Sequence, residues 1–193
     1  MATLLLGNMK KAIFKEGVLP VLLITLGVMM RFLPHPANFA PIAAIALFGG
    51  TYVQNKKLAL ALPLLAMIIS DFFIGFDSLQ MRIVVYGSFL LIVLTGLFVR
   101  KYKNIGTVFG GTLFGSVLFY LITNFAFFYS PSMYPHNLTG VVSSYINALP
   151  FLKNTLLGDL FYVSVFFGVY ELIVYYKRTY APSHSSARPN PRA

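Results

Sequence analysis

Lysine and arginine are concentrated in alternate segments between six long apolar stretches, and this pattern constrains the fold more than any other feature of the chain. The apolar stretches cover residues 17–33, 38–53, 58–76, 82–99, 105–129 and 155–176. Four of the seven segments around them hold 12 of the 15 basic residues: Lys10, Lys11, Lys15, Lys56, Lys57, Arg100, Lys101, Lys103, Lys177, Arg178, Arg188 and Arg192. The other three hold one each, Arg31, Arg82 and Lys153. Because short loops rich in Lys and Arg stay cytoplasmic, the pattern predicts six transmembrane helices with both termini in the cytoplasm.

The composition of the chain agrees with a membrane protein. Of its 193 residues, 58% are hydrophobic and only 10% are charged, which is too apolar for a soluble domain. We therefore expect an all-α fold, a polytopic helix bundle (17–176) that passes several times through the inner membrane of the cell. A cytoplasmic segment (1–16) precedes the bundle and a disordered basic tail (177–193) follows it. The first apolar stretch lacks a signal-peptide cleavage site, so we interpret it as a retained helix, with Met9 as an alternative start to Met1.

The same features argue against several other classes of protein. The net charge of +10 follows from the alternation, and no basic stripe with interleaved aromatics remains to indicate a nucleic-acid partner. Six spans leave no room for a soluble catalytic domain, and the chain contains no GxxxxGK[ST] phosphate-binding motif. Cysteine is absent, which excludes disulfides and thiolate metal sites. We interpret His35 and His136 as interface residues, and we expect neither a metal nor a cofactor.

Two segments do not fit the six-span pattern simply. The second apolar stretch begins at Asn38, a residue suited to cap a helix, and ends at Gly49-Gly50, a common helix stop. Its helix of about 15 residues would be roughly 22 Å long, shorter than a ~30 Å hydrocarbon core, so it is either a short span or a re-entrant segment. Ser130–Lys153 is predicted to form the longest outer connection, with a mildly amphipathic part (138–149) that lies on the outer surface or caps the bundle.

Polar side chains at membrane depth are costly and indicate functional sites, and in this chain they gather toward the outer side. Asp71 lies about 21 Å along its helix from the cytoplasmic edge, and Asp159 about 27 Å. Asn124 is near the outer end of the fifth stretch, and Asn154 is expected to cap the sixth. The outer connections add Arg31, His35, Asn38, Asp77, Arg82, Tyr129, Tyr134 and His136. This asymmetry predicts a pocket that opens outward over an apolar floor.

These polar residues allow three interpretations. In the first, Asp71 and Asp159 form ion pairs with Arg31 and Arg82, and the asparagines cap helices. In the second, the group binds a small polar solute that enters from outside. In the third, Asp71 and Asp159 are a catalytic pair, since neighbouring carboxylates in a low dielectric suit acid–base chemistry. No nucleophile–base, HExxH or aspartic-protease motif accompanies them, so we expect no enzymatic activity.

Two further features concern packing rather than binding. Glu171, near the cytoplasmic end of its helix, is expected to pair with an N-terminal lysine or to reach the membrane interface. Small residues spaced along the fifth stretch predict close helix packing. They are Gly106, Gly110, Gly111, Gly115 and Ser116.

Four stretches of the sequence resemble a family of small bacterial membrane proteins of unknown function. They are RFLPHPANFAPIAAIALFGG (Arg31–Gly50), VYGSF (Val85–Phe89), LITNF (Leu121–Phe125) and FLKNTLLGDLFY (Phe151–Tyr162). That family is in turn similar to the substrate-binding S components of energy-coupling-factor vitamin transporters, six-helix proteins with an outward-facing vitamin site. S components present an Ala-x-x-x-Ala pattern in their first helix for docking, and here Ala40 and Ala44 have this spacing in the second. The resemblance implies a role for Arg31, His35, Pro36, Asn38, Tyr86, Asn124, Asn154 and Asp159.

Residue pattern and resemblance together predict an integral membrane protein that binds and transports a small, vitamin-like solute. The predicted binding residues are Arg31, His35, Asn38, Asp71, Tyr86, Asn124, Asn154 and Asp159. The expected partners are the solute, the lipid bilayer and, where transport is driven by ATP, a separate energy-coupling ATPase module. A structural or assembly subunit without transport activity is the alternative.

Overall fold

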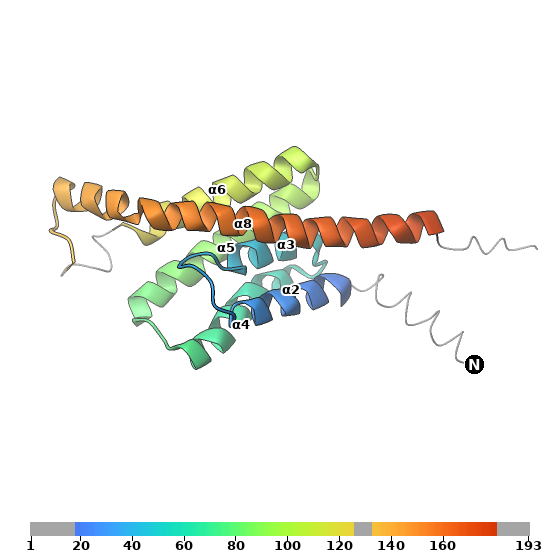
Figure 1. Ribbon diagram of the computed structural model, residues 1–193, viewed down its shortest axis with the longest axis horizontal. Helices are drawn as coiled ribbons and strands as arrows, with labels where there is room; N and C mark the ends of the chain where they lie inside the picture. The colour runs from blue at the N-terminus through green and yellow to red at the C-terminus, as the bar shows by residue number, and fades with distance from the viewer. Residues whose placement is uncertain (1–17, 126–132, 181–193) are drawn as a thin grey trace, which may run out of the picture.

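The described part of the protein, residues 18–125 and 133–180 of a computed structural model, consists of helices joined by short connections. This part contains no strand, so the prediction of an all-α fold is confirmed. The expectations for residues 1–17, for Tyr129 and for the tail beyond Tyr180 concern segments outside the described residues. The helices are α2 (Val18–Met30), α3 (Ile42–Tyr52), α4 (Lys56–Ile74), α5 (Leu79–Lys101), α6 (Ile105–Thr123) and α8 (Leu138–Tyr180) (Figure 1).

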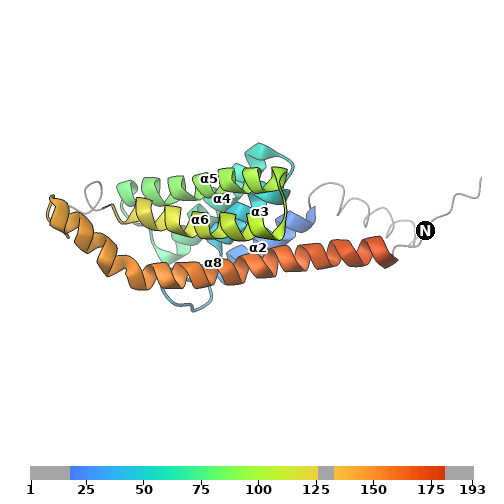
Figure 2. The same cartoon turned by 90° about the horizontal axis from the view of Figure 1, so that it is seen from above.

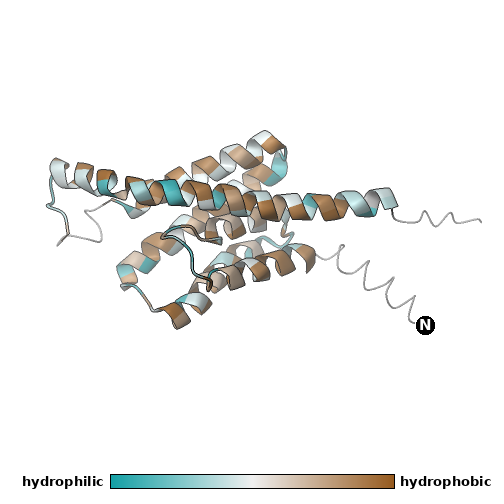
Figure 3. Ribbon diagram, viewed as in Figure 1, coloured by the Kyte–Doolittle hydropathy of each residue, from teal (hydrophilic) through white to brown (hydrophobic). Residues whose placement is uncertain are grey.

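Four of these helices, α4, α5, α6 and α8, are long and apolar enough to cross a membrane. Large apolar side chains such as Phe72, Phe98 and Phe114 are more than half exposed on them, which suits contact with lipid. In Figure 3 the helix ribbons are mostly brown, and the teal segments lie mainly at the connections and on α8. The helices α2 and α3 have only 13 and 11 described residues, which is short for a membrane span. The total of six transmembrane helices therefore stays a prediction.

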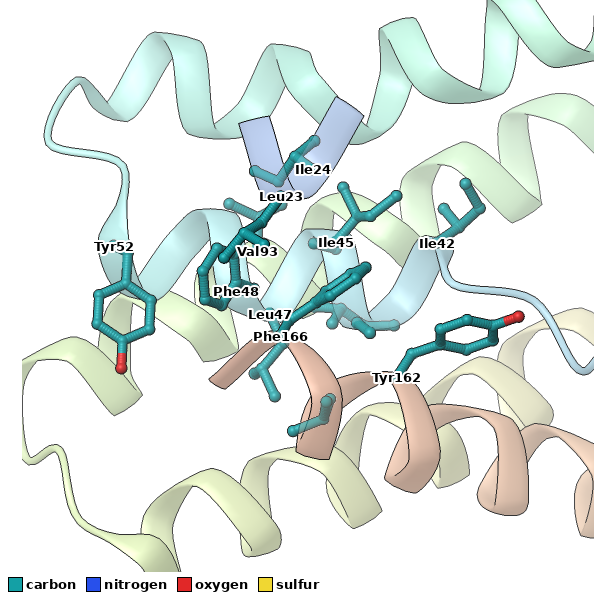
Figure 4. Packing of buried hydrophobic residues seen from close by; sticks show 14 of the residues in the cluster. Leu23, Ile24, Ile42, Ile45, Leu47, Phe48, Tyr52, Val93, Tyr162 and Phe166 are labelled. Carbon is teal, nitrogen blue, oxygen red and sulfur yellow. The ribbon is translucent and has the colours of Figure 1, made fainter. Parts of the chain in front are cut away.

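The shortest of the described helices, α3, is the centre of the fold. Ten of its 11 residues are buried, and it contacts α2, α4, α5, α6 and α8. At 1.5 Å per residue it is roughly 17 Å long, and the helices around it shield most of its backbone from lipid. Phe48, which is fully buried, packs against the rings of Tyr52 and Phe166 (Figure 4).

The predicted limits of this central helix are wrong at both ends. Asn38 does not cap it, because the helix begins four residues later and Asn38 adopts a left-handed conformation with φ of 63°. The Gly49-Gly50 pair does not stop it, because the helix continues to Tyr52. Gly50 serves packing instead: a Cβ at this position would lie 2.4 Å from the Val93 carbonyl oxygen of α5.

The last helix, α8, overturns the predicted outer connection. Residues 138–149, expected to form a separate surface segment, are the first part of a continuous helix that runs to Tyr180. Its 43 residues span roughly 65 Å, and α8 extends beyond the other helices at both ends in Figure 1. Pro150 lies inside it; a proline bends a helix, and the N-terminal part is inclined to the remainder (Figure 2). Asn154 is therefore an interior residue of α8 and not its cap.

The connections predicted to be cytoplasmic meet at one end of the bundle, here called the basic end. Arg100 donates hydrogen bonds to the Val53 carbonyl oxygen (3.1 Å) and to Gln54 Oε1 (2.5 Å) in the α3–α4 connection. Lys103, between α5 and α6, forms an ion pair with Glu171 of α8 (2.6 Å). The lysines predicted to pair with Glu171 lie outside the described residues. The helix α3 runs toward this end from the loop that precedes it (Figure 1), and its crossing of the membrane stays a prediction.

Because the chain contains no cysteine, single-cysteine variants can test the predicted orientation. Lys101 at the basic end and Met133 in the α6–α8 connection are both exposed. In intact cells we expect a membrane-impermeant maleimide to label Met133→Cys but not Lys101→Cys, which should react only after permeabilisation. Labelling of Lys101→Cys in intact cells would contradict the predicted topology.

Candidate functional site

A cavity of about 330 Å³ lies at the end of the bundle opposite the basic end. Its wall is built by the α2–α3 connection and by residues of α3, α4, α5, α6 and α8. The polar residues that line it are Arg31, His35, Asn38, Asp77, Thr155 and Asp159. Four of the eight predicted binding residues, Arg31, His35, Asn38 and Asp159, therefore share one cavity.

The connection between α2 and α3 forms one side of this cavity and is fixed to α8. Asn154 Nδ2 donates a hydrogen bond to the Ala37 carbonyl oxygen (3.0 Å). The ring of Phe39 contacts that of Tyr162, with centroids 5.6 Å apart. Gly158 permits this close approach, since a Cβ on it would lie 3.0 Å from Phe39 Cα. Asn154 thus positions the loop, and within the described chain it is not part of the cavity wall.

Arg31 is held at the edge of the cavity by an ion pair. Its Nη2 lies 2.8 Å from Asp71 Oδ1, and its Nη1 donates to Ser70 Oγ and to the Met67 sulfur. The second Asp71 oxygen, Oδ2, accepts a hydrogen bond from the Tyr86 hydroxyl (2.6 Å). The structural prediction for Asp71 is therefore confirmed. Among the described residues, Asp71 and Tyr86 do not line the cavity, so they support Arg31 from behind.

Asp159 has a different environment. It is only 3% exposed, and its Oδ2 accepts a hydrogen bond from Ser116 Oγ of α6 (2.6 Å). No basic residue of the described chain forms an ion pair with it, so the predicted pairing with Arg31 or Arg82 is wrong. Its Oδ1 accepts no hydrogen bond from a described residue, and the residue lines the cavity. The cavity therefore contains a buried carboxyl group with which no basic side chain of the described residues forms an ion pair.

A neighbouring cavity, also about 330 Å³, shares Asn38, Asp77, Val85 and Phe119 with the first. Asn124 lines this second cavity, and its Nδ2 donates to the backbone carbonyl oxygen one helical turn earlier (2.9 Å). The predicted residue Asn124 is therefore placed beside the other polar residues but in the adjoining space.

Sequence reasoning missed several residues that shape this site. Ser116 was assigned to a packing face, and nothing in the sequence connects it to Asp159, which lies 43 residues further along the chain. Asp77 was placed at the outer side but not in the site. Phe89 and Phe119 line the cavity with stacked rings, centroids 5.2 Å apart. Only the VYGSF motif pointed to Phe89, and no signal distinguished Phe119 from the many lipid-facing phenylalanines.

The described residues offer no comparable site elsewhere. No group of three or more His, Cys, Asp and Glu residues lies together in the described segments. A groove of about 490 Å³ between α5 and α6 is larger, but its lining comprises apolar residues, threonines and glycines. Specific ligand sites combine apolar walls with a few convergent polar groups. That combination favours the cavity around Asp159.

Comparison with known proteins gives the chain a family. The model of a family of unknown function, DUF6580, matches residues 11–184, a range that includes all the described helices and every predicted binding residue. No curated protein and no solved structure matches the chain significantly. The chain therefore belongs to DUF6580, a family of unknown function.

Proposed function

We propose that the protein binds a small solute in the cavity around Asp159, and that the solute enters from the end of the bundle opposite the basic end. The observation that supports this most strongly is the Asp159 carboxylate, which is buried, lines the cavity and accepts a single hydrogen bond from the described residues. An uncompensated buried charge is costly. Structural carboxylates are typically paired within the protein, as Asp71 is with Arg31. A solute group that reaches Asp159 supplies the missing partner.

The remainder of the cavity suits a molecule with one polar and one apolar part. Its volume of about 330 Å³ is at the lower end of the range for small-molecule sites. Asn38 and Asp77 lie in the wall with Asp159, while Ile42 and Phe89 provide apolar surface. A solute of this kind would direct its polar group to the carboxylates and cover the apolar wall with its carbon skeleton.

Movement of the solute across the inner membrane is the second part of the proposal. It is supported by four described helices that are long and apolar enough to span a bilayer. The chain contains no phosphate-binding motif for ATP hydrolysis, so a separate energy-coupling module would drive transport.

A structural or assembly subunit is the second candidate, and the network of Arg31, Asp71 and Tyr86 favours it. These three side chains satisfy one another's charges and hydrogen bonds, as residues that only join helices would. Asp159 distinguishes the two candidates, because it lies in a cavity wall and lacks such a partner among the described residues.

Native mass spectrometry of protein purified in mild detergent tests the proposal. We expect the wild type to retain a discrete small molecule that is absent from Asp159→Asn. The control is Lys153→Gln, an exposed position of the same helix outside the cavity wall, and this variant should retain the molecule. A wild-type protein that carries no molecule, and that no vitamin or amine in a panel stabilises against heat, would favour the structural subunit.

A further inference from the structure

We infer that the solute is an organic cation, an amine or quaternary ammonium compound with an apolar part. The inference rests on the proposed function, because it identifies the chemical class that the same cavity would bind. Three observations lead to it: the charges of the cavity wall, the ion pair that already neutralises its arginine, and its aromatic surface.

The charged side chains at the cavity have an excess of negative charge. Asp77 and Asp159 both line it, and neither forms an ion pair with a described residue. Arg31 also lines it, but its charge is neutralised by Asp71 at 2.8 Å. The wall and the carboxylate directly behind it therefore combine three aspartates with one guanidinium group.

The other basic groups near this end of the bundle lie outside the cavity wall or are exposed. The guanidinium carbon of Arg82 lies 4.9 Å from the centre of the Phe76 ring, and Arg82 is not among the described residues of the cavity wall. Lys153 is exposed and lies outside the wall as well. His35 is in the wall but exposed, and its Nδ1 lies 3.0 Å from the carbonyl oxygen of the next residue. Residues 126–132 have the sequence AFFYSPS, without a charged side chain.

A cavity with this charge balance discriminates by the sign of the solute's charge. Charges that are removed from water interact much more strongly than charges in bulk solvent. A solute with a carboxylate or a phosphate would bring a like charge to the buried Asp159, which is strongly unfavourable. A neutral solute would leave Asp159 without an ionic partner. An ammonium group would complete an ion pair with it.

The apolar part of the wall favours an organic cation over a metal ion. The stacked rings of Phe89 and Phe119 line the cavity, and the faces of aromatic rings attract cations. Ile42 and Met67 extend the apolar surface, which suits a carbon skeleton. Metal ions such as calcium instead require several oxygen ligands around one point, and the described residues provide no cluster of three or more acidic or imidazole side chains.

A matched set of three probes tests the charge preference: phenethylammonium, phenethyl alcohol and hydrocinnamate. Each carries a phenyl ring on a short chain, and they differ in charge. Binding to the purified protein at neutral pH is measured by equilibrium dialysis and by thermal stabilisation. We expect the ammonium probe to bind about tenfold or more tightly than the alcohol, and the carboxylate probe not to bind measurably.

Variants then locate the effect. Asp159→Asn should weaken binding of phenethylammonium about 30-fold or more, as expected when one partner of a buried charge pair is removed. Asp77→Asn should have a smaller effect because Asp77 is exposed. Glu171→Gln makes the same change of charge at the basic end, far from the cavity. In this variant the affinity for phenethylammonium should stay within about twofold of the wild type.

The outcomes separate this inference from the proposed function. Tighter or equal binding of the alcohol or the carboxylate would overturn the inference and leave solute binding intact. Binding of the ammonium probe that Asp159→Asn does not weaken would overturn it too. A co-purified molecule with a basic or quaternary nitrogen supports the inference even where phenethylammonium is too small to bind, whereas one without a cationic nitrogen contradicts it. If no probe binds and no molecule co-purifies, both proposals are overturned.

Discussion

Asp71→Asn is expected to lower the free energy of unfolding by about 3 kcal/mol, because it removes one partner of a partly buried ion pair. The side chains of Arg31 and Asp71 are only 16% and 10% exposed, and their N–O distance is 2.8 Å. Without the carboxylate, Arg31 keeps its contacts with Ser70 and Met67, neither of which neutralises its charge. An amide also disturbs the hydrogen bond that the Tyr86 hydroxyl donates to Asp71 Oδ2.

Denaturation in mixed detergent micelles, followed by circular dichroism, measures this loss. The double variant with Arg31→Met provides the control, because the second substitution removes the stranded charge. The two single effects should therefore not add, and we expect a coupling energy of about 2 kcal/mol. Additive losses would show that the ion pair itself contributes little and that Asp71 acts through its other contacts.

Asp159→Asn provides the comparison. For this second aspartate at membrane depth we expect the substitution to raise the free energy of unfolding, whereas Asp71→Asn lowers it. Asparagine can still accept the hydrogen bond from Ser116, while the uncompensated charge disappears. We expect the solute-free variant to be more stable than the wild type by about 1 kcal/mol, as in other proteins whose binding sites are held at a cost to stability. A loss comparable to that of Asp71→Asn would indicate a structural role for Asp159 and remove the main support for solute binding.

The parts of the structure that the sequence predicts best are those that the membrane itself restricts. Backbone at membrane depth must satisfy its hydrogen bonds internally. A long apolar stretch therefore predicts a helix rather than an isolated strand or a loop. Basic residues are confined to particular connections, and this placed Arg100 and Lys103 at the same end of the bundle. The cost of burying polar groups similarly explains why Arg31 and Asp159, far apart in the sequence, were expected on one side and line one cavity.

The sequence failed where a local signal has two structural meanings. The mild polarity of residues 138–149 indicated a separate surface segment, yet α8 runs through them and accommodates Pro150 within a continuous helix. Gly49-Gly50 indicated a stop, but the helix continues, and contact with α5 determines the need for glycine at Gly50. The hydrogen bond from Ser116 to Asp159 depends on how α6 and α8 pack. No pattern within either helix contains that information.

The contact between α3 and α5 leads to the second large expected effect. A Cβ on Gly96 would lie 2.4 Å from the Leu47 carbonyl oxygen and 3.0 Å from Gly50 Cα, and all these neighbours are backbone atoms that cannot rotate away. The Thr51 hydroxyl also donates to the Gly96 carbonyl oxygen (3.2 Å), so the two helices cannot separate without losing this bond. We therefore expect Gly96→Ala to lower the free energy of unfolding by about 3 kcal/mol or more.

Gly87→Ala is the matched control, because it introduces the same methyl group into the same helix at a position where nothing lies within 4 Å. Alanine is favoured over glycine in a helix by about 1 kcal/mol, so this variant should be as stable as the wild type or slightly more stable. The difference between the two variants isolates the cost of separating α5 from the buried central helix. Equal stability of Gly96→Ala and Gly87→Ala would mean that α3 and α5 do not approach as closely as described. The enclosed position of α3, on which one wall of the cavity depends, would then be wrong.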